Sequence, residues 1–241
     1  MSRALVMRAA LAVAVLAASG SAGAQPTKSP RWGTFELSLS GYRPRIDAEF
    51  GGRAAPFEAA FGGGRNLMFR ADLAYTVFRD FGSLDVGIGG GYWEKSGHGF
   101  LPDGTASGDS TALKVIPSRL SVTYRFDVLA ERWSIPLAPY ARVSFDRYWW
   151  WVTNGSGGTA TSGGKSGWGA TNGYSFSGGV ALLLDVIDPE LAREMDRDVG
   201  INHTYAFVDF TKSYVSDFGS SSSWDMSDDR VTIAGGLMFV F

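Results

Sequence analysis

The sequence predicts an all-β fold: a transmembrane antiparallel up-and-down β-barrel of eight strands with one short helix. Three observations predict it. Eight segments alternate between apolar and polar residues with a period of two, which places successive side chains on opposite faces of a strand. Mean hydropathy is −0.02 although 14% of the residues are aromatic, and a transmembrane barrel hides its apolar surface in such alternation. Long and short connections also alternate between the segments, as in membrane barrels.

The closing segment, residues 230–241, shows the alternation most clearly. One face is apolar, whereas the other is small or polar, and the sequence stops on an aromatic residue. The apolar face is made of Val231, Ile233, Leu237, Phe239 and Phe241. A period of two over twelve residues predicts a strand with one face in an apolar environment.

Seven upstream segments alternate in the same way, and each is long enough to cross a bilayer when tilted. They are residues 32–42, 67–78, 83–93, 113–126, 137–152, 174–186 and 203–214. The parity of the fourth changes at Pro117, which cannot donate to a ladder and so predicts a bulge. A count of ten strands stays open if residues 43–66 contain a further hairpin, although Phe50, Phe57 and Phe61 favour a folded loop or short helix.

The connections supply an independent test of the barrel. Long polar loops are expected at residues 43–66, 94–112, 153–173 and 215–229, and the connections after the second and fourth segments are short. The connection after the sixth segment has Asp188 at an N-cap, Pro189 at the first helical position and Gly200 past the end. These residues predict a helix of two to three turns at 188–197, which we expect to be a small periplasmic cap against the barrel mouth.

The first 24 residues have the composition of a secretory signal peptide. Arg3 and Arg8 precede an apolar run at 9–18, and Ala22-Gly23-Ala24 is a small-x-small cleavage site. We therefore divide the chain into a cleaved signal peptide (1–24), a periplasmic linker (25–31) and the barrel (32–241). The chain has no Cys, which excludes disulfides and a lipoprotein anchor. Removing Arg3 and Arg8 leaves 20 basic and 24 acidic residues, and the net charge of −4 gives no footprint for nucleic acid.

Three stretches resemble an uncharacterised outer-membrane β-barrel family that is best represented in myxobacteria. They are Tyr42-Arg-Pro-Arg-Ile-Asp-Ala-Glu-Phe50, the run from Asp188-Pro189 to His203-Thr-Tyr205, and the closing strand. More distantly, the chain is similar to the small eight-stranded barrels of the OmpA and OmpW type. The resemblance implies a bacterial outer membrane, with outer-membrane lipids and lipopolysaccharide as partners. It also implies that the barrel-assembly machinery reads Leu237, Phe239 and Phe241. No activity and no cofactor come with the resemblance.

An even strand number with long loops on one side predicts that both termini are periplasmic and the long loops extracellular. If the apolar parity faces lipid, charged residues face an interior just wide enough for side chains. An unpaired buried charge is costly, so we expect these charges to pair and close the lumen. They are Glu36, Arg70, Asp72, Asp85, Arg119, Arg125, Arg142, Asp146, Asp185, Asp209 and Arg230.

Aromatic residues gather at the strand ends, where an interfacial girdle is expected. They are Trp32, Tyr42, Tyr92, Trp93, Tyr148, Trp149, Trp150 and Trp151. Arg147, on the lipid parity, is placed to reach headgroups or lipopolysaccharide phosphate. Alternatively, the aromatic run 148–151 stacks on sugars together with Trp168 and Trp224.

The leading functional hypothesis is a closed barrel with a structural or cell-surface interaction role and an unassigned surface ligand. The first alternative is a narrow pore or a conduit for small hydrophobic molecules. The second is a lipid-modifying enzyme at the outer rim, for which His98 with Ser96, Asp103 and Ser110 would be needed. Their Gly-rich surroundings are too flexible to preorganise a triad, and His203 is expected at the periplasmic end, so we predict no enzyme. The loop acids are not spaced like a calcium loop, so we predict no metal site.

Overall fold

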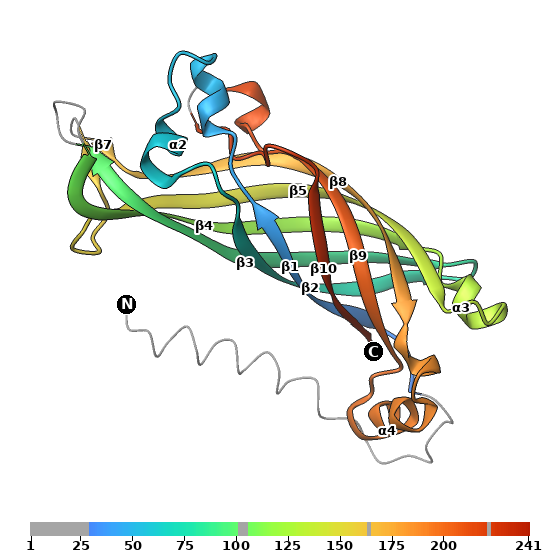
Figure 1. Cartoon of the computed structure of the whole chain (residues 1–241). Coiled ribbons are helices and arrows are strands. Elements are labelled where there is room, and N and C mark those ends of the chain that lie inside the picture. The colour runs from blue at the N-terminus through green and yellow to red at the C-terminus, as the bar shows by residue number, and fades with distance from the viewer. Residues whose placement is uncertain (1–28, 101–105, 163–164, 221–222) are drawn as a thin grey trace.

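The computed structural model describes residues 29–100, 106–162, 165–220 and 223–241. Eight antiparallel strands form a closed barrel in the order β1-β10-β9-β8-β5-β4-β3-β2 (Figure 1). The predicted eight-stranded up-and-down topology is confirmed, and the ten-strand alternative is wrong. The predicted signal peptide and most of the linker lie outside the described residues.

The barrel strands agree with the alternating segments to within two residues at most ends. Their bounds are β1 Gly33–Tyr42, β2 Asn66–Arg79, β3 Ser83–Phe100, β4 Ala106–Arg125, β5 Leu137–Thr153, β8 Trp168–Leu183, β9 His203–Tyr214 and β10 Thr232–Val240. The short strands β6 Thr161–Ser162 and β7 Lys165–Ser166 pair with each other outside the barrel. β1 closes the barrel on β10, with Leu37 opposite Leu237.

The helical elements all lie in the connections. They are η1 Ile46–Phe50, α2 Pro56–Phe61, α3 Val128–Arg132, η2 Leu184–Val186, α4 Pro189–Val199 and η3 Asp217–Gly219. α4 confirms the predicted helix, because the Asp188 side chain accepts hydrogen bonds from the amides of Glu190 and Leu191, and Gly200 is left-handed at φ 74°. No helix among the described residues is long and apolar enough to span a membrane.

The two ends of the barrel differ. At one end, called the loop end, lie η1, α2 and the connection between β9 and β10 (Figure 1). At the other, called the terminal end, β1 begins and β10 ends, next to α3 and α4 (Figure 1).

Three predictions about local structure are wrong. Much of the predicted loop 94–112 is paired strand, since β3 and β4 continue as a hairpin beyond the barrel. Pro117 causes no bulge, because Gly90 pairs with Ser118 and Trp93 with Val115 in one register. The change of parity in this segment instead arises because apolar side chains before Pro117 point into the barrel. The sixth strand begins at Trp168 and ends at Leu183, and residues 184–186 are a 3-10 turn.

The outer surface of the barrel is apolar on every strand. Val86, Leu120, Val143 and Ile233 are exposed, whereas the residues next to them in sequence point inward or are less exposed. A face this apolar, extending around a closed sheet, lies in an apolar surrounding rather than in water.

Candidate functional site: the barrel interior

The middle of the interior holds ion pairs that cross the lumen. Arg142 Nη2 on β5 lies 2.7 Å from both carboxylate oxygens of Glu36 on β1, and Arg142 Nε donates to Thr123 Oγ1 at 2.8 Å. Arg142 and Glu36 are each 4% exposed. A charged pair this deeply buried depends on its hydrogen bonds, because water cannot replace them.

A second buried pair spans three strands. Arg119 on β4 donates through Nε and Nη2 to the two oxygens of Asp72 on β2, at 2.6 and 2.7 Å. Gly89 on β3 lies between them in the register. A Cβ at Gly89 would stand 1.7 Å from Asp72 Oδ1, so the glycine leaves room for the two side chains to meet over β3.

Three further charged groups complete this middle layer. Asp209 Oδ2 accepts from Tyr140 Oη at 3.0 Å, and Arg70 Nη2 donates to Tyr148 Oη at 2.6 Å. Asp146 is 1% exposed, lies opposite Arg119 in the β4–β5 register, and has no hydrogen-bond partner among the described residues. The Asp146 carboxylate is therefore balanced by the field of the arginines rather than by direct contact.

An apolar cluster and a smaller polar cluster fill the terminal end. Arg125 Nη1 lies 3.2 Å from Asp85 Oδ2 and Arg125 Nε lies 3.6 Å from Asp127 Oδ2. Thr76 Oγ1 donates to Asp85 at 2.7 Å. The apolar cluster beside them consists of Ala138, Tyr140, Ala181, Leu183, Tyr205, Phe207, Met238 and Val240.

A larger apolar cluster, which we call the outer plug, closes the interior at the loop end. Strands and loops both contribute to it, and Tyr42 Oη donates to the Met226 carbonyl at 2.6 Å. Trp224 stacks on Trp150 with ring centroids 4.2 Å apart. The outer plug consists of Tyr42, Ile46, Phe57, Met68, Trp93, Leu113, Val115, Tyr148, Trp150, Val215 and Met226.

Ion pairs connect the two loops that contribute side chains to the outer plug. Arg65, before β2, donates to Asp228 at 2.6 Å and also binds Asp229, both before β10. The backbone repeats this connection, since the Asp229 amide donates to the Arg43 carbonyl at 3.1 Å. Burial raises the pKa of the Asp228 carboxyl above its usual range, and the hydrogen bond from Arg65 opposes that shift.

The structure places nine of the eleven predicted lumen charges on the inner face: Glu36, Arg70, Asp72, Asp85, Arg119, Arg125, Arg142, Asp146 and Asp209. The prediction is wrong for Arg230, whose side chain is 78% exposed before β10 begins, near Asp229. It is also wrong for Asp185, which lies in η2 beyond β8 and contacts His203 Nδ1 at 2.6 Å.

The predicted aromatic girdle divides into two groups. Trp32, Tyr92 and Trp149 are exposed on the outer face, and Trp151 is partly exposed. The prediction is wrong for the other four, Tyr42, Trp93, Tyr148 and Trp150, which belong to the buried outer plug. Strict parity would have found them, because Tyr148 and Trp150 share the phase of Arg142 and Asp146 along β5.

Of the residues considered for chemistry, His98 and Ser110 lie directly opposite each other in the β3–β4 register. His98 is exposed in β3 rather than in a loop, and Asp103 lies outside the described residues. His203 pairs with Asp185 at the terminal end. The described residues hold no group of three metal-ligating side chains.

The final residues lie at the barrel seam. Leu237 and Phe239 pair with β1, and Phe239 stacks on Phe35 at 6.5 Å. The Phe241 carbonyl accepts from the Trp32 amide at 2.5 Å, and the Phe241 ring lies 5.7 Å from the Trp32 ring. The last residue therefore helps to close the barrel, and its reading by an assembly machinery stays a prediction.

Comparison with known proteins finds solved structures that resemble this chain. No protein-family model and no curated protein sequence matches the chain, so the predicted myxobacterial resemblance is not tested. Neisserial surface protein A is 10% identical with a TM-score of 0.43, and the match covers 88% of this chain and 97% of that one. The N-terminal β-barrel domain of Pseudomonas aeruginosa OprF is 11% identical with a TM-score of 0.40, covering 88% and 100%.

Ail of Yersinia pestis, solved with the heparin analogue sucrose octasulfate, is 9% identical with a TM-score of 0.39, covering 89% of this chain and 99% of that one. The closed eight-stranded antiparallel barrel of this chain follows from its own strand order.

Proposed function

We propose that the chain is a sealed outer-membrane barrel with a structural or cell-surface interaction role, in which the loop end is extracellular and both termini are periplasmic. The observation that carries this proposal is the outer plug, which fills the interior between the loops and the middle charge layer.

The small free volume in the middle of the barrel supports a sealed interior. Beneath the outer plug, the cavity among Arg70, Arg119 and Arg142 has a volume of about 20 Å³, close to the minimum that one water molecule needs. The Arg119–Asp72 and Arg142–Glu36 pairs hold the side chains around it in place. Movement of an ion along the axis would require both an apolar cluster and these pairs to open.

The height of the outer apolar band supports a membrane location. On β2 the outward apolar residues run from Leu67 to Val77, about 33 Å of strand at about 3.3 Å per residue. A strand tilt of about 40° reduces this to about 25 Å, the height of the apolar band of outer-membrane barrels.

Single-channel recording in a planar lipid bilayer tests the proposal. We expect the inserted wild-type barrel to be silent and the variant Trp93→Ala with Tyr148→Ala, which removes two rings of the outer plug, to show openings. Trp149→Ala, on the outer face of the same barrel, is the matched control and stays silent. Steady conductance by the wild-type protein would overturn the sealed lumen and favour the narrow pore.

A further inference from the structure

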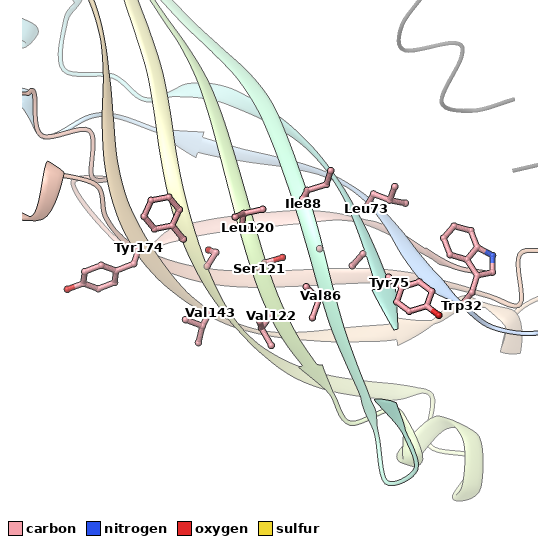
Figure 2. A pocket seen from close by; sticks show the side chains of 14 residues that line it. Trp32, Leu73, Tyr75, Val86, Ile88, Leu120, Ser121, Val122, Val143 and Tyr174 are labelled. Atoms are coloured by element: carbon pink, nitrogen blue, oxygen red, sulfur yellow. The ribbon is translucent and has the colours of Figure 1, made fainter. Parts of the chain in front are cut away.

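The outer face of the barrel carries an apolar hollow that the sealed interior does not explain. It crosses β2, β3, β4 and β5 and has a volume of about 730 Å³, within the range of sites that hold one small-molecule ligand. Figure 2 shows its two rows of side chains, with Trp32 at one end and Tyr174 at the other. We call it the lateral groove.

Strand register defines the two rows of the lateral groove. Leu73, Ile88, Leu120 and Phe145 are paired neighbours across the four strands, and so are Tyr75, Val86, Val122 and Val143. The inward row between them has only small side chains, from Ala74, Gly87, Ser121 and Ser144. A Cβ at Gly87 would stand 2.6 Å from the Ala74 Cβ, so these small residues allow the wall to curve inward and leave the hollow outside.

A cation lies just beyond the lateral groove on the side of the loop end. Arg147 is the next outward residue of β5 after Phe145, and its guanidinium lies 4.3 Å from the centre of the Trp149 ring. It is exposed, and no carboxylate among the described residues pairs with it. Its neighbours across the register, Ser118 and Gly90, are too small to separate it from the groove.

We propose that the lateral groove and Arg147 bind one molecule of lipid A, the phosphorylated, acylated anchor of lipopolysaccharide. The inference rests on the proposed orientation, which puts Arg147 at the headgroup level of the outer leaflet. An acyl chain fills the groove between Trp32 and Tyr174, and a phosphate accepts hydrogen bonds from the Arg147 guanidinium. Charge and shape then favour the same occupant, because the groove offers apolar area and its outer end offers an uncompensated donor.

Native mass spectrometry of the folded full chain in detergent, titrated with purified bis-phosphorylated lipid A, tests this proposal. We expect saturable binding of one molecule. Arg147→Gln weakens binding about fivefold, the effect of one basic residue near a membrane surface. Dephosphorylated lipid A binds about as weakly, and Arg147→Gln causes no further loss with it.

Matched variants separate the groove from the rest of the lipid face. Val122→Phe fills the lateral groove and lowers affinity, whereas Val180→Phe, an outward residue of β8 away from the groove, leaves it unchanged. Equal losses for Arg147→Gln and Lys212→Gln, an outward cation on β9, would show non-specific attraction and overturn the proposal. Equal affinity for phosphatidylglycerol would likewise overturn lipid A as the occupant.

The two proposals fail in distinguishable ways. A folded barrel that inserts into bilayers and stays silent, yet binds no lipid A, refutes only the lateral groove. A barrel that does not insert refutes the membrane location itself, whatever its lipid binding in detergent.

Discussion

Replacing Arg142 by methionine is expected to destabilise the barrel by about 3–5 kcal/mol, the cost of removing one partner of a buried ion pair. The expected loss is this large because of the surroundings of the Glu36 carboxylate. That carboxylate is 4% exposed, and both of its oxygens accept from Arg142 at 2.7 Å. Without the guanidinium, the carboxylate has lost these bonds and remains shielded from water.

A double-mutant cycle isolates the pair. Arg142→Met combined with Glu36→Leu replaces the ions by apolar groups, and we expect it to fall within about 1.5 kcal/mol of the wild-type protein. Glu36→Leu alone leaves the Arg142 guanidinium buried without its partner and should also cost about 3–5 kcal/mol, so the coupling free energy is at least about 4.5 kcal/mol. Urea unfolding of the folded barrel, followed by tryptophan fluorescence, measures all four corners of the cycle.

Arg230→Met is the matched control, because the Arg230 side chain is 78% exposed and such a change shifts the unfolding free energy by less than about 0.5 kcal/mol. A loss below about 1 kcal/mol for Arg142→Met alone would refute the reasoning, since it would mean that water reaches Glu36 in the folded barrel.

Three further predictions follow from single residues. Trp93→Ala removes a ring that is 0% exposed and lowers the unfolding free energy by about 3–5 kcal/mol, whereas Trp149→Ala on the outer face costs less than half as much in the same assay. Gly89→Ala pushes a methyl group into the Arg119–Asp72 pair and costs about 1–3 kcal/mol; an unchanged urea midpoint would contradict the contact. Because burial raises the pKa of Asp228, the folded state takes up a proton before the unfolded chain does. The unfolding free energy of the wild type relative to Asp228→Asn should therefore rise as pH is lowered from 7 towards 4, and the opposite trend would show that pairing with Arg65 dominates.

The strands could be predicted from the sequence because alternation reports directly which face meets an apolar surrounding. The cap residues Asp188 and Gly200 likewise defined α4, since their chemistry is local. Alternation failed beyond the apolar band, where β3 and β4 continue as a hairpin rich in Gly, Ser and Thr with no apolar pattern.

The interior was harder to predict, because its contacts join strands that are distant in the sequence. Which arginine meets which carboxylate depends on the shape of the closed barrel, and Arg142 could not be assigned to Glu36 from spacing. The aromatic residues failed for another reason. A girdle was expected from their place at strand ends, although the parity of Tyr148 and Trp150 already pointed inward.

The outer plug also changes what the surface loops can tolerate. Loops of a barrel usually accept insertions, because their backbone is exposed and their side chains support nothing. Here Ile46 and Phe57 come from the connection between β1 and β2, and Val215 and Met226 from the connection between β9 and β10, yet all four are buried. These two connections should therefore accept few changes of length. The turn at Gly157, exposed and left-handed at φ 80°, packs on no such core, and an epitope tag inserted there should leave the fold intact.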